Sequence, residues 1–132
     1  MTARTFLITG ASKGIGRALA TYLSEAGHTV VGIARNADDP TFPGTLVALD
    51  LADRQRSAHV LGELSERFAF DGLVNNVGLV RPQALGEIDL DAFDDVMRVN
   101  LHSALQATQA LLPGMRHRGW GRIVNISSLT VL

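Results

Sequence analysis

Hydrophobic positions along the chain alternate between short apolar runs and longer stretches with helical spacing. The short runs, rich in branched residues, predict strands at 4–8, 28–34, 45–49, 71–74 and 122–126. Apolar residues spaced three and four positions apart predict helices at 17–26, about 53–68 and about 91–117. This alternation predicts a Rossmann-like, doubly wound α/β fold with a parallel sheet. We expect the strand order 3-2-1-4-5, with the part present ending after the fifth strand.

The apolar faces of the predicted helices indicate how each one packs. In the second helix we expect Ala58, Leu61, Leu64 and Phe68 to be buried, with His59 on the solvated side. The long third helix carries apolar residues over more than one stripe, which is typical of a helix buried on two sides. One side is expected to face the sheet. The other is expected to face a second subunit or a further part of the chain.

Composition narrows the class of protein. The chain has 132 residues, 46% of them hydrophobic, which suits a single domain spanning residues 1–132. A net charge of −1 argues against a nucleic-acid partner. The absence of cysteine excludes disulfides and thiolate chemistry, and the four histidines lack ligand spacing, so no metal site is expected. Without a signal peptide or a bilayer-spanning apolar run, we expect a cytoplasmic location.

A glycine-rich turn lies between the first predicted strand and the first predicted helix. Its sequence is Thr9-Gly10-Ala11-Ser12-Lys13-Gly14-Ile15-Gly16, with the glycine spacing G-x-x-x-G-x-G. A helix N-terminus presents free N–H groups and partial positive charge, and glycine lets the backbone approach a pyrophosphate closely. The turn therefore predicts a nucleotide site. A purely structural turn is the alternative, and a Walker P-loop is excluded because no Lys-Ser/Thr pair follows the last glycine.

The residues after the second predicted strand bear on the type of nucleotide. An acid in this region would suit a free ribose 2′-hydroxyl, whereas an arginine suits a 2′-phosphate. The chain has Ala34-Arg35 here, and its nearest acids, Asp38 and Asp39, lie further along a short loop at 36–44. Together with Lys13 in the glycine turn, Arg35 favours NADP(H) over NAD(H). The alternative is that Arg35 is a solvated loop residue.

Polar residues follow the other predicted strands. Asp50-Leu51 ends the third, where the carboxylate could accept from an adenine amino group or from nearby backbone amides. Asn75-Asn76-Val77-Gly78 ends the fourth, and Ser127-Ser128 follows the fifth. An open α/β sheet binds its ligand at this edge. Asn100 is an unusual mid-helix residue, which either bonds the backbone locally or serves the site; the residues alone favour the local bond.

In this order, these pieces resemble the short-chain dehydrogenase/reductase family. The turn at 9–16 matches the family's cofactor turn, and Asp50-Leu51 looks like its adenine-contacting pair. Asn75-Asn76-Val77-Gly78 is similar to its Asn-Asn-Ala-Gly motif, with Val77 in place of alanine. Asn100 stands where the family carries its catalytic asparagine. The run Gly121 to Ser128 looks like the strand that delivers the catalytic serine, which would be Ser128.

The resemblance implies a site and a reaction. NADP(H) would bind along the edge where the strands end, with hydride passing between the nicotinamide and a carbonyl or alcohol substrate. Ser128 would donate a hydrogen bond to the substrate oxygen, and Asn100 would hold a water in a proton relay. A 3-oxoacyl thioester is the implied substrate. The implied cofactor-binding residues are Gly10, Ala11, Ser12, Lys13, Gly14, Ile15, Gly16, Arg35, Asp50, Leu51, Asn76, Val77 and Gly78.

One departure from the family pattern is large. The family requires a tyrosine thirteen positions after the serine and a lysine four positions beyond it, whereas the chain given ends at Leu132. Its one tyrosine, Tyr22, and its one lysine, Lys13, stand elsewhere. We therefore expect the N-terminal portion of a longer, oligomeric reductase, a tetramer or a dimer, and no catalysis by this portion alone. The alternative is a non-catalytic NADP-binding module.

Overall fold

The computed structural model describes residues 2–128, within which five strands form one parallel sheet. The order across the sheet is β3-β2-β1-β4-β5, and every neighbouring pair is parallel. The predicted fold class and strand order are thus confirmed. The strands are β1 (Thr5–Thr9), β2 (Thr29–Ala34), β3 (Thr45–Ala48), β4 (Gly72–Asn75) and β5 (Arg122–Asn125).

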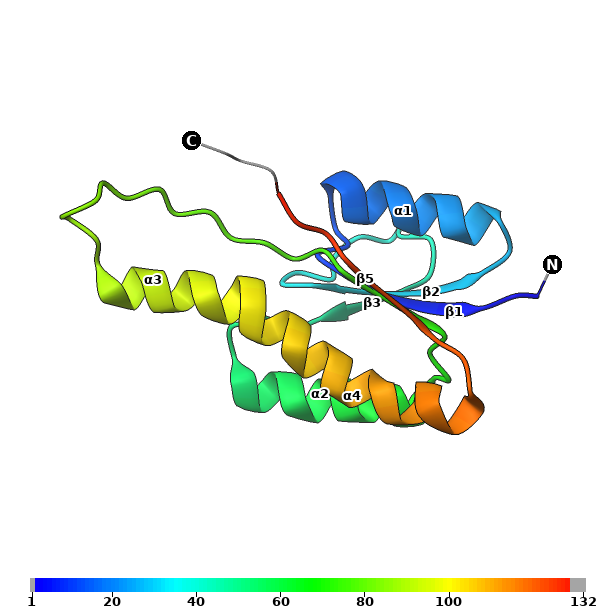
Figure 1. Cartoon of the computed structure of the whole chain (residues 1–132). Helices are drawn as coiled ribbons and strands as arrows, with labels where there is room; N and C mark the ends of the chain where they lie inside the picture. The colour runs from blue at the N-terminus through cyan, green and yellow to red at the C-terminus, as the bar shows by residue number, and fades with distance from the viewer. Residues whose placement is uncertain (1, 129–132) are drawn as a thin grey trace.

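Helices cover the sheet from both sides, as Figure 1 shows. Helix α1 (Gly14–Glu25) lies on one face, and α2 (Arg54–Arg67) and α4 (Ser103–Arg118) lie together on the other. Each face buries its own apolar cluster, and the larger one lies under α2 and α4. The middle strands are nearly inaccessible to solvent, as expected for a parallel sheet covered on both faces. No helix within residues 2–128 has the length and apolar composition to cross a bilayer.

Helix α2 buries Leu61 and Leu64 as predicted, and Phe68 at its end is partly buried, but its stripe differs at the first position. Ala58 is exposed rather than buried, so its assignment to the core was wrong. The periodicity was obscured because Ser57, a polar residue, takes a core position and is fully buried. The helix starts after Asp53, whose side chain accepts from the Arg56 amide at 3.0 Å. Its buried residues are Ser57, Val60, Leu61 and Leu64.

The long helix predicted over 91–117 is interrupted. It divides into α3 (Leu90–Met97), the π-helical turn η1 (Arg98–His102) and α4, so the expectation of one continuous helix was wrong. The Ser103 amide donates to the Arg98 carbonyl, five residues back, which shifts the apolar stripe around the axis. Side chains such as Leu101 and Leu105 are more than half exposed. The second apolar side of this helix therefore faces solvent in the single chain.

The connection from β2 to β3 contains no helix. A parallel crossover usually carries a covering helix, but here residues 35–44 cross the sheet as an irregular link. Phe42 covers the sheet instead, and its side chain is 8% exposed. A Cβ added to Gly32 in β2 would lie 2.6 Å from Phe42 Cζ and 2.8 Å from Ala11 Cβ. Phe42 thus packs directly on β2 beside α1.

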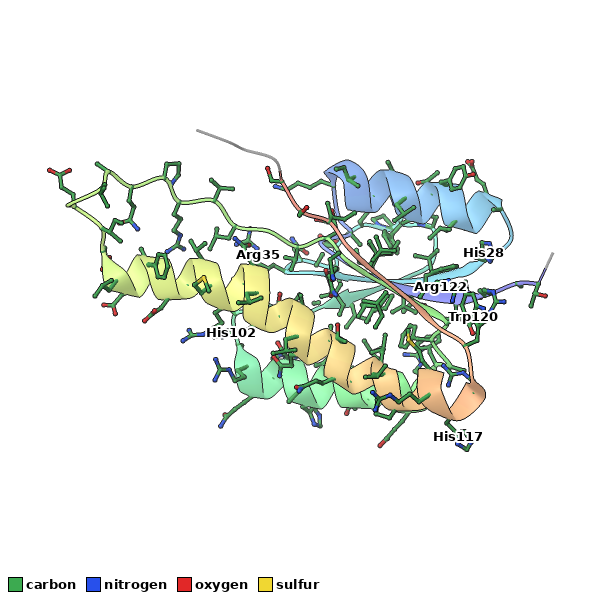
Figure 2. The ribbon with its side chains drawn as sticks, in the orientation of Figure 1. His28, Arg35, His102, His117, Trp120 and Arg122 are labelled. Atoms are coloured by element: carbon green, nitrogen blue, oxygen red, sulfur yellow. The ribbon has the colours of Figure 1, made fainter. Side chains whose placement is uncertain are left out.

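Trp120 lies at the edge where the strands begin, close to the start of β5 (Figure 2). The Arg4 guanidinium lies 3.3 Å from its ring centroid, and that of Arg122 lies 4.7 Å away. Asp71 accepts from the Thr5 amide at 2.9 Å and so connects β1 to the residue before β4. These contacts fasten the starts of β1, β4 and β5 to one another.

A matched pair of glycine substitutions tests the packing of Phe42. Gly32→Ala should lower the free energy of unfolding by about 1–3 kcal/mol, because the added methyl group overlaps the Phe42 ring. Gly62→Ala is the control, since the position lies in α2 with open space around it. That change should stabilise the chain by about 1 kcal/mol through helix propensity. Urea denaturation followed by circular dichroism measures both, and equal stability of the Gly32→Ala and wild-type chains would contradict the packing described.

Candidate functional site

A cleft of about 470 Å³ opens at the edge where the strands end. Its walls come from the residues that follow β1, β2, β3 and β4, together with the segment leading to α3. Because all the strands are parallel, their carboxyl ends meet here, as the sequence predicted. Of the predicted site residues, those that line the cleft are Gly10, Ser12, Lys13, Arg35, Asp50, Leu51, Asn76, Val77 and Gly78.

The glycine turn is built from backbones in very close contact. Gly10 and Gly14 have φ values of 62° and 60°, which favour glycine. A Cβ on Gly16 would lie 2.3 Å from the Gly10 carbonyl oxygen and 2.6 Å from Asn76 Nδ2. The Asn76 side chain donates to that same carbonyl at 3.1 Å. The turn therefore has no room for a side chain at Gly16, and Asn76 fastens it to the end of β4.

Thr9, the last residue of β1, joins the two turns that form the cleft. Its hydroxyl oxygen accepts from the backbone amides of Asn76 at 2.9 Å and Val77 at 3.1 Å. The same hydroxyl donates to the Val74 carbonyl at 3.4 Å. Thr9 is 1% exposed, so this network is shielded from water. Nothing in the sequence marks this role of Thr9, because its three partners lie more than 60 residues away along the chain.

The start of α1 suits an anion. Its N-cap residue is Lys13, no side chain caps its first amides, and no acid lies in its first turn. By contrast, Asp53 caps α2 and Asp89 caps α3. Uncapped amides at a helix N-terminus present donors and partial positive charge. Ile15, in the same turn, is exposed, whereas Ala11 is fully buried and its amide donates to the Ile33 carbonyl at 3.1 Å.

Two cationic side chains lie on the cleft beside this helix. Lys13 and Arg35 are both exposed and both line the cleft; Figure 2 shows Arg35 near the end of the sheet opposite Trp120. Asp50 also lines the cleft, and its Oδ1 accepts from the Ala52 amide at 2.9 Å. The local-backbone interpretation of Asp50 is therefore confirmed, while its place on the cleft keeps it available to a ligand. The next residue along, Leu51, is 4% exposed and packs in the core.

Asn100 lies within the π-helical turn, next to the cleft-lining Val99, and is not itself part of the cleft lining. Its Oδ1 accepts from the Leu79 amide at 2.7 Å, and its Nδ2 donates to the Leu79 carbonyl at 2.8 Å. Leu79 follows the Asn75–Gly78 turn directly, so the interpretation of a local helix bond was wrong. The same oxygen lies 3.7 Å from the position of a Cβ on Gly78. Asn100 thus holds the segment that leaves the cleft.

The end of β5 is aligned with β4 by a pair of asparagines. Asn75 Nδ2 donates to Asn125 Oδ1 at 2.9 Å, and the Ile126 amide donates to the Asn75 carbonyl at 2.9 Å. Ser128 follows three residues after β5 and is exposed. It does not belong to the cleft lining. The chain thus presents Ser128 just beyond a strand end whose register is fixed by side-chain as well as backbone bonds.

An ion pair across the mouth of the cleft was not anticipated. Arg81 Nη1 lies 3.1 Å from Asp95 Oδ2, and both residues line the cleft. Arg98 lies 3.8 Å from the other Asp95 oxygen. The pair connects the segment after Gly78 to α3, and no motif or periodicity marks residues fourteen positions apart as partners. In residues 2–128 no group of three or more histidine, aspartate or glutamate side chains could hold a metal ion.

Comparison with known proteins agrees with this geometry. A family model described as short chain dehydrogenase matches residues 4–132. This chain belongs to the short-chain dehydrogenase/reductase family. Among solved members, a short-chain dehydrogenase from Streptomyces avermitilis superimposes with a TM-score of 0.88 at 36% identity, over 96% of this chain and 50% of that one. A gluconate 5-dehydrogenase from Burkholderia cenocepacia, in complex with NADP and tartrate, superimposes with a TM-score of 0.85 at 34% identity. The match covers 97% of this chain and 55% of that one.

Curated members of the family are similar in sequence. A 3-oxoacyl-[acyl-carrier-protein] reductase from Vibrio cholerae is 34% identical over 131 residues, which cover 93% of this chain and 54% of that protein. An NADPH-dependent pterin aldehyde reductase from Arabidopsis thaliana is 35% identical over an alignment of 141 positions, which covers 97% of this chain and 57% of that protein. This short-chain dehydrogenase/reductase chain therefore spans about half the length of the relatives it matches.

Replacing the Thr9 hydroxyl tests the junction between the two turns. Thr9→Val keeps the shape but leaves the buried Asn76 and Val77 amides without their acceptor. We expect the free energy of unfolding to fall by about 1–3 kcal/mol, the usual cost of unpaired buried polar groups. Thr9→Ser retains the hydroxyl and should lose less. Chemical denaturation monitored by circular dichroism gives both values, and an equal loss in the two variants would mean that the hydroxyl is not the cause.

Proposed function

We propose that the chain is the cofactor-binding portion of an NADP(H)-dependent oxidoreductase that acts on a carbonyl or alcohol group. The observation that carries the proposal is a single cleft joining an uncapped helix N-terminus to two exposed cations, Lys13 and Arg35. An anionic ligand with two separate phosphate groups matches this arrangement. Family membership supports the oxidoreductase class.

The residues of the cleft fit a dinucleotide with a 2′-phosphate. The amides at the start of α1 would hold the pyrophosphate, because the glycines leave the backbone uncovered there and Gly14 has open space around it. Arg35 and Lys13 would hold the 2′-phosphate, with Ser12 as a further donor. Asp50 would accept from the adenine amino group, and the backbone around Asn76, Val77 and Gly78 would border the nicotinamide. When bound, the cofactor supplies or accepts the hydride.

We propose that Ser128 and Asn100 act on the substrate. Ser128 would donate a hydrogen bond to the substrate oxygen, where negative charge grows as a carbonyl is reduced. Asn100 would hold a water in a proton relay, a role beside the one in which it fixes Leu79. The name of the Vibrio cholerae relative supports a 3-oxoacyl thioester, and that of the Arabidopsis relative supports a small aldehyde. The shared proposal is a carbonyl substrate reduced by NADPH.

A second candidate function is a non-catalytic NADP-binding module. It is supported by the cleft itself, because the residues that would bind the nucleotide all lie within this portion of the protein. In both cases we propose a cytoplasmic homo-oligomer. The exposed apolar side chains Leu101 and Leu105 of the interrupted helix support contact with another subunit or a further part of the chain.

The two candidates differ in turnover. The native full-length protein should oxidise NADPH when given a panel of 3-oxoacyl thioesters and small aldehydes, whereas residues 1–132 alone should bind the cofactor without turnover. Ser128→Ala in the active protein should lower kcat by about 100- to 1,000-fold, the usual loss for an oxyanion donor. Absorbance of the reduced nicotinamide follows the reaction. Binding without turnover by the native protein would favour the module, and turnover by residues 1–132 would contradict our assignment.

The choice of cofactor is tested by binding. Arg35→Ala should weaken NADP⁺ binding by about 10- to 100-fold, because a hydrogen bond to a charged group contributes about 1.5–3 kcal/mol. The affinity for NAD⁺ should change less than about twofold. Arg116→Ala is the control, since it removes the same charge from an exposed position at the opposite end of the sheet. Isothermal titration calorimetry of the wild type and both variants with each nucleotide gives the six affinities, and wild-type affinity for NAD⁺ equal to that for NADP⁺ would overturn the proposed preference.

A further inference from the structure

Arg17 connects α1 to the link between β2 and β3. From the first turn of α1, its Nη2 donates to the carbonyl oxygen and to the hydroxyl oxygen of Thr41, both at 3.1 Å. The same nitrogen lies 3.7 Å from Asp39 Oδ2. The guanidinium also lies 5.4 Å from the centroid of the Phe42 ring. One side chain thus contacts three residues of a segment more than twenty positions away.

Asp39 is held within the same group. Its Oδ1 accepts from the Thr41 hydroxyl at 2.7 Å and from the Thr41 amide at 3.0 Å. The hydroxyl bond is the main reason why the pKa of Asp39 lies below its ordinary value, with the Thr41 amide and Arg17 acting in the same direction against partial desolvation. The carboxylate is therefore ionised and fully engaged at neutral pH. It does not line the cleft, although Arg35, four positions earlier, does.

The link needs such an attachment because it has no helix of its own. Regular pairing between β2 and β3 ends at Ala34, and the Leu49 amide donates to the Ala34 carbonyl. Arg35, the next residue, begins the irregular segment. The buried ring of Phe42 fixes the far end of that segment, and the Arg17 contacts fix its middle. The same α1 whose N-terminus would face the pyrophosphate thus also holds the residues after Arg35.

We propose that Arg17, Asp39 and Thr41 form a positioning clamp that sets the cofactor preference of this cleft. By holding the link, the clamp keeps Arg35 beside the place of the 2′-phosphate. It also keeps the charge of the Asp39 carboxylate paired with Arg17 rather than opposed to the phosphate. The inference deepens the proposed NADP(H) function and rests on it. Arg17 and Asp39 are positioning residues, since neither lines the cleft.

The test uses two nucleotide probes that differ only in the 2′-phosphate, adenosine 2′,5′-bisphosphate and 5′-AMP. Calorimetry measures the affinity of the 132-residue chain for each probe. The readout is the affinity for the bisphosphate divided by the affinity for 5′-AMP. Thr41→Val, which removes the hydroxyl shared by Arg17 and Asp39, should reduce the ratio at least fivefold through weaker bisphosphate binding. Arg17→Leu should do the same. Binding of 5′-AMP should stay within twofold, which a general loss of structure would not allow.

Controls separate the clamp from stability and from charge. Thr41→Ser retains the hydroxyl and should keep the wild-type ratio, and Arg116→Leu removes a remote exposed charge and should also keep it. Hydrogen exchange of the amides at 36–41 should accelerate in Thr41→Val, with α2 and the central strands unchanged. An unchanged ratio in a folded Thr41→Val variant would overturn the clamp. A wild-type ratio near one, or no effect of Arg35→Ala on it, would instead overturn the proposed NADP(H) preference.

Discussion

The close approach of Gly16, the Gly10 carbonyl and the Asn76 side chain at the start of α1 determines the rest of the site. Gly16 lies so close to the Gly10 carbonyl and the Asn76 amide group that a single methyl group would not fit between them. This contact brings the helix N-terminus to the ends of β1 and β4 at once, and the Thr9 hydroxyl completes the junction beneath it. Because those strands are parallel and neighbouring, the cleft forms directly above the junction.

The features that sequence predicted well are those encoded by local pattern. Alternating strands and helices with short connections permit few topologies, and right-handed crossovers reduce them further. The edge of the sheet that carries the cleft follows from that alone, whereas the order 3-2-1-4-5 is one of two common doubly wound orders and agrees with the family resemblance. Residues that end strands, such as Arg35, Asp50 and Asn76, could be placed on this edge because a parallel sheet brings all the strand ends together.

The features that sequence did not predict depend on contacts between distant residues or on small shifts in periodicity. The π-helical turn adds a single residue to one turn, so the apolar pattern through Asn100 looked like a continuous helix. In α2, Ser57 takes the core position that was predicted for Ala58, because a serine was not counted as core. The partners of Arg17 and Arg81 lie 14 to 24 residues away, in segments whose course no propensity describes.

The position of Trp120 makes it a natural optical probe. It is the only tryptophan in the chain, and two guanidinium groups lie against its ring at the edge where the strands begin. The cleft lies at the opposite edge, so a nucleotide bound there would not touch the indole (Figure 2). A change in its emission would therefore report separation of β5 from β1. The emission of this one residue thus follows the integrity of the sheet in the presence of a ligand, without direct interference from the ligand and without an added label.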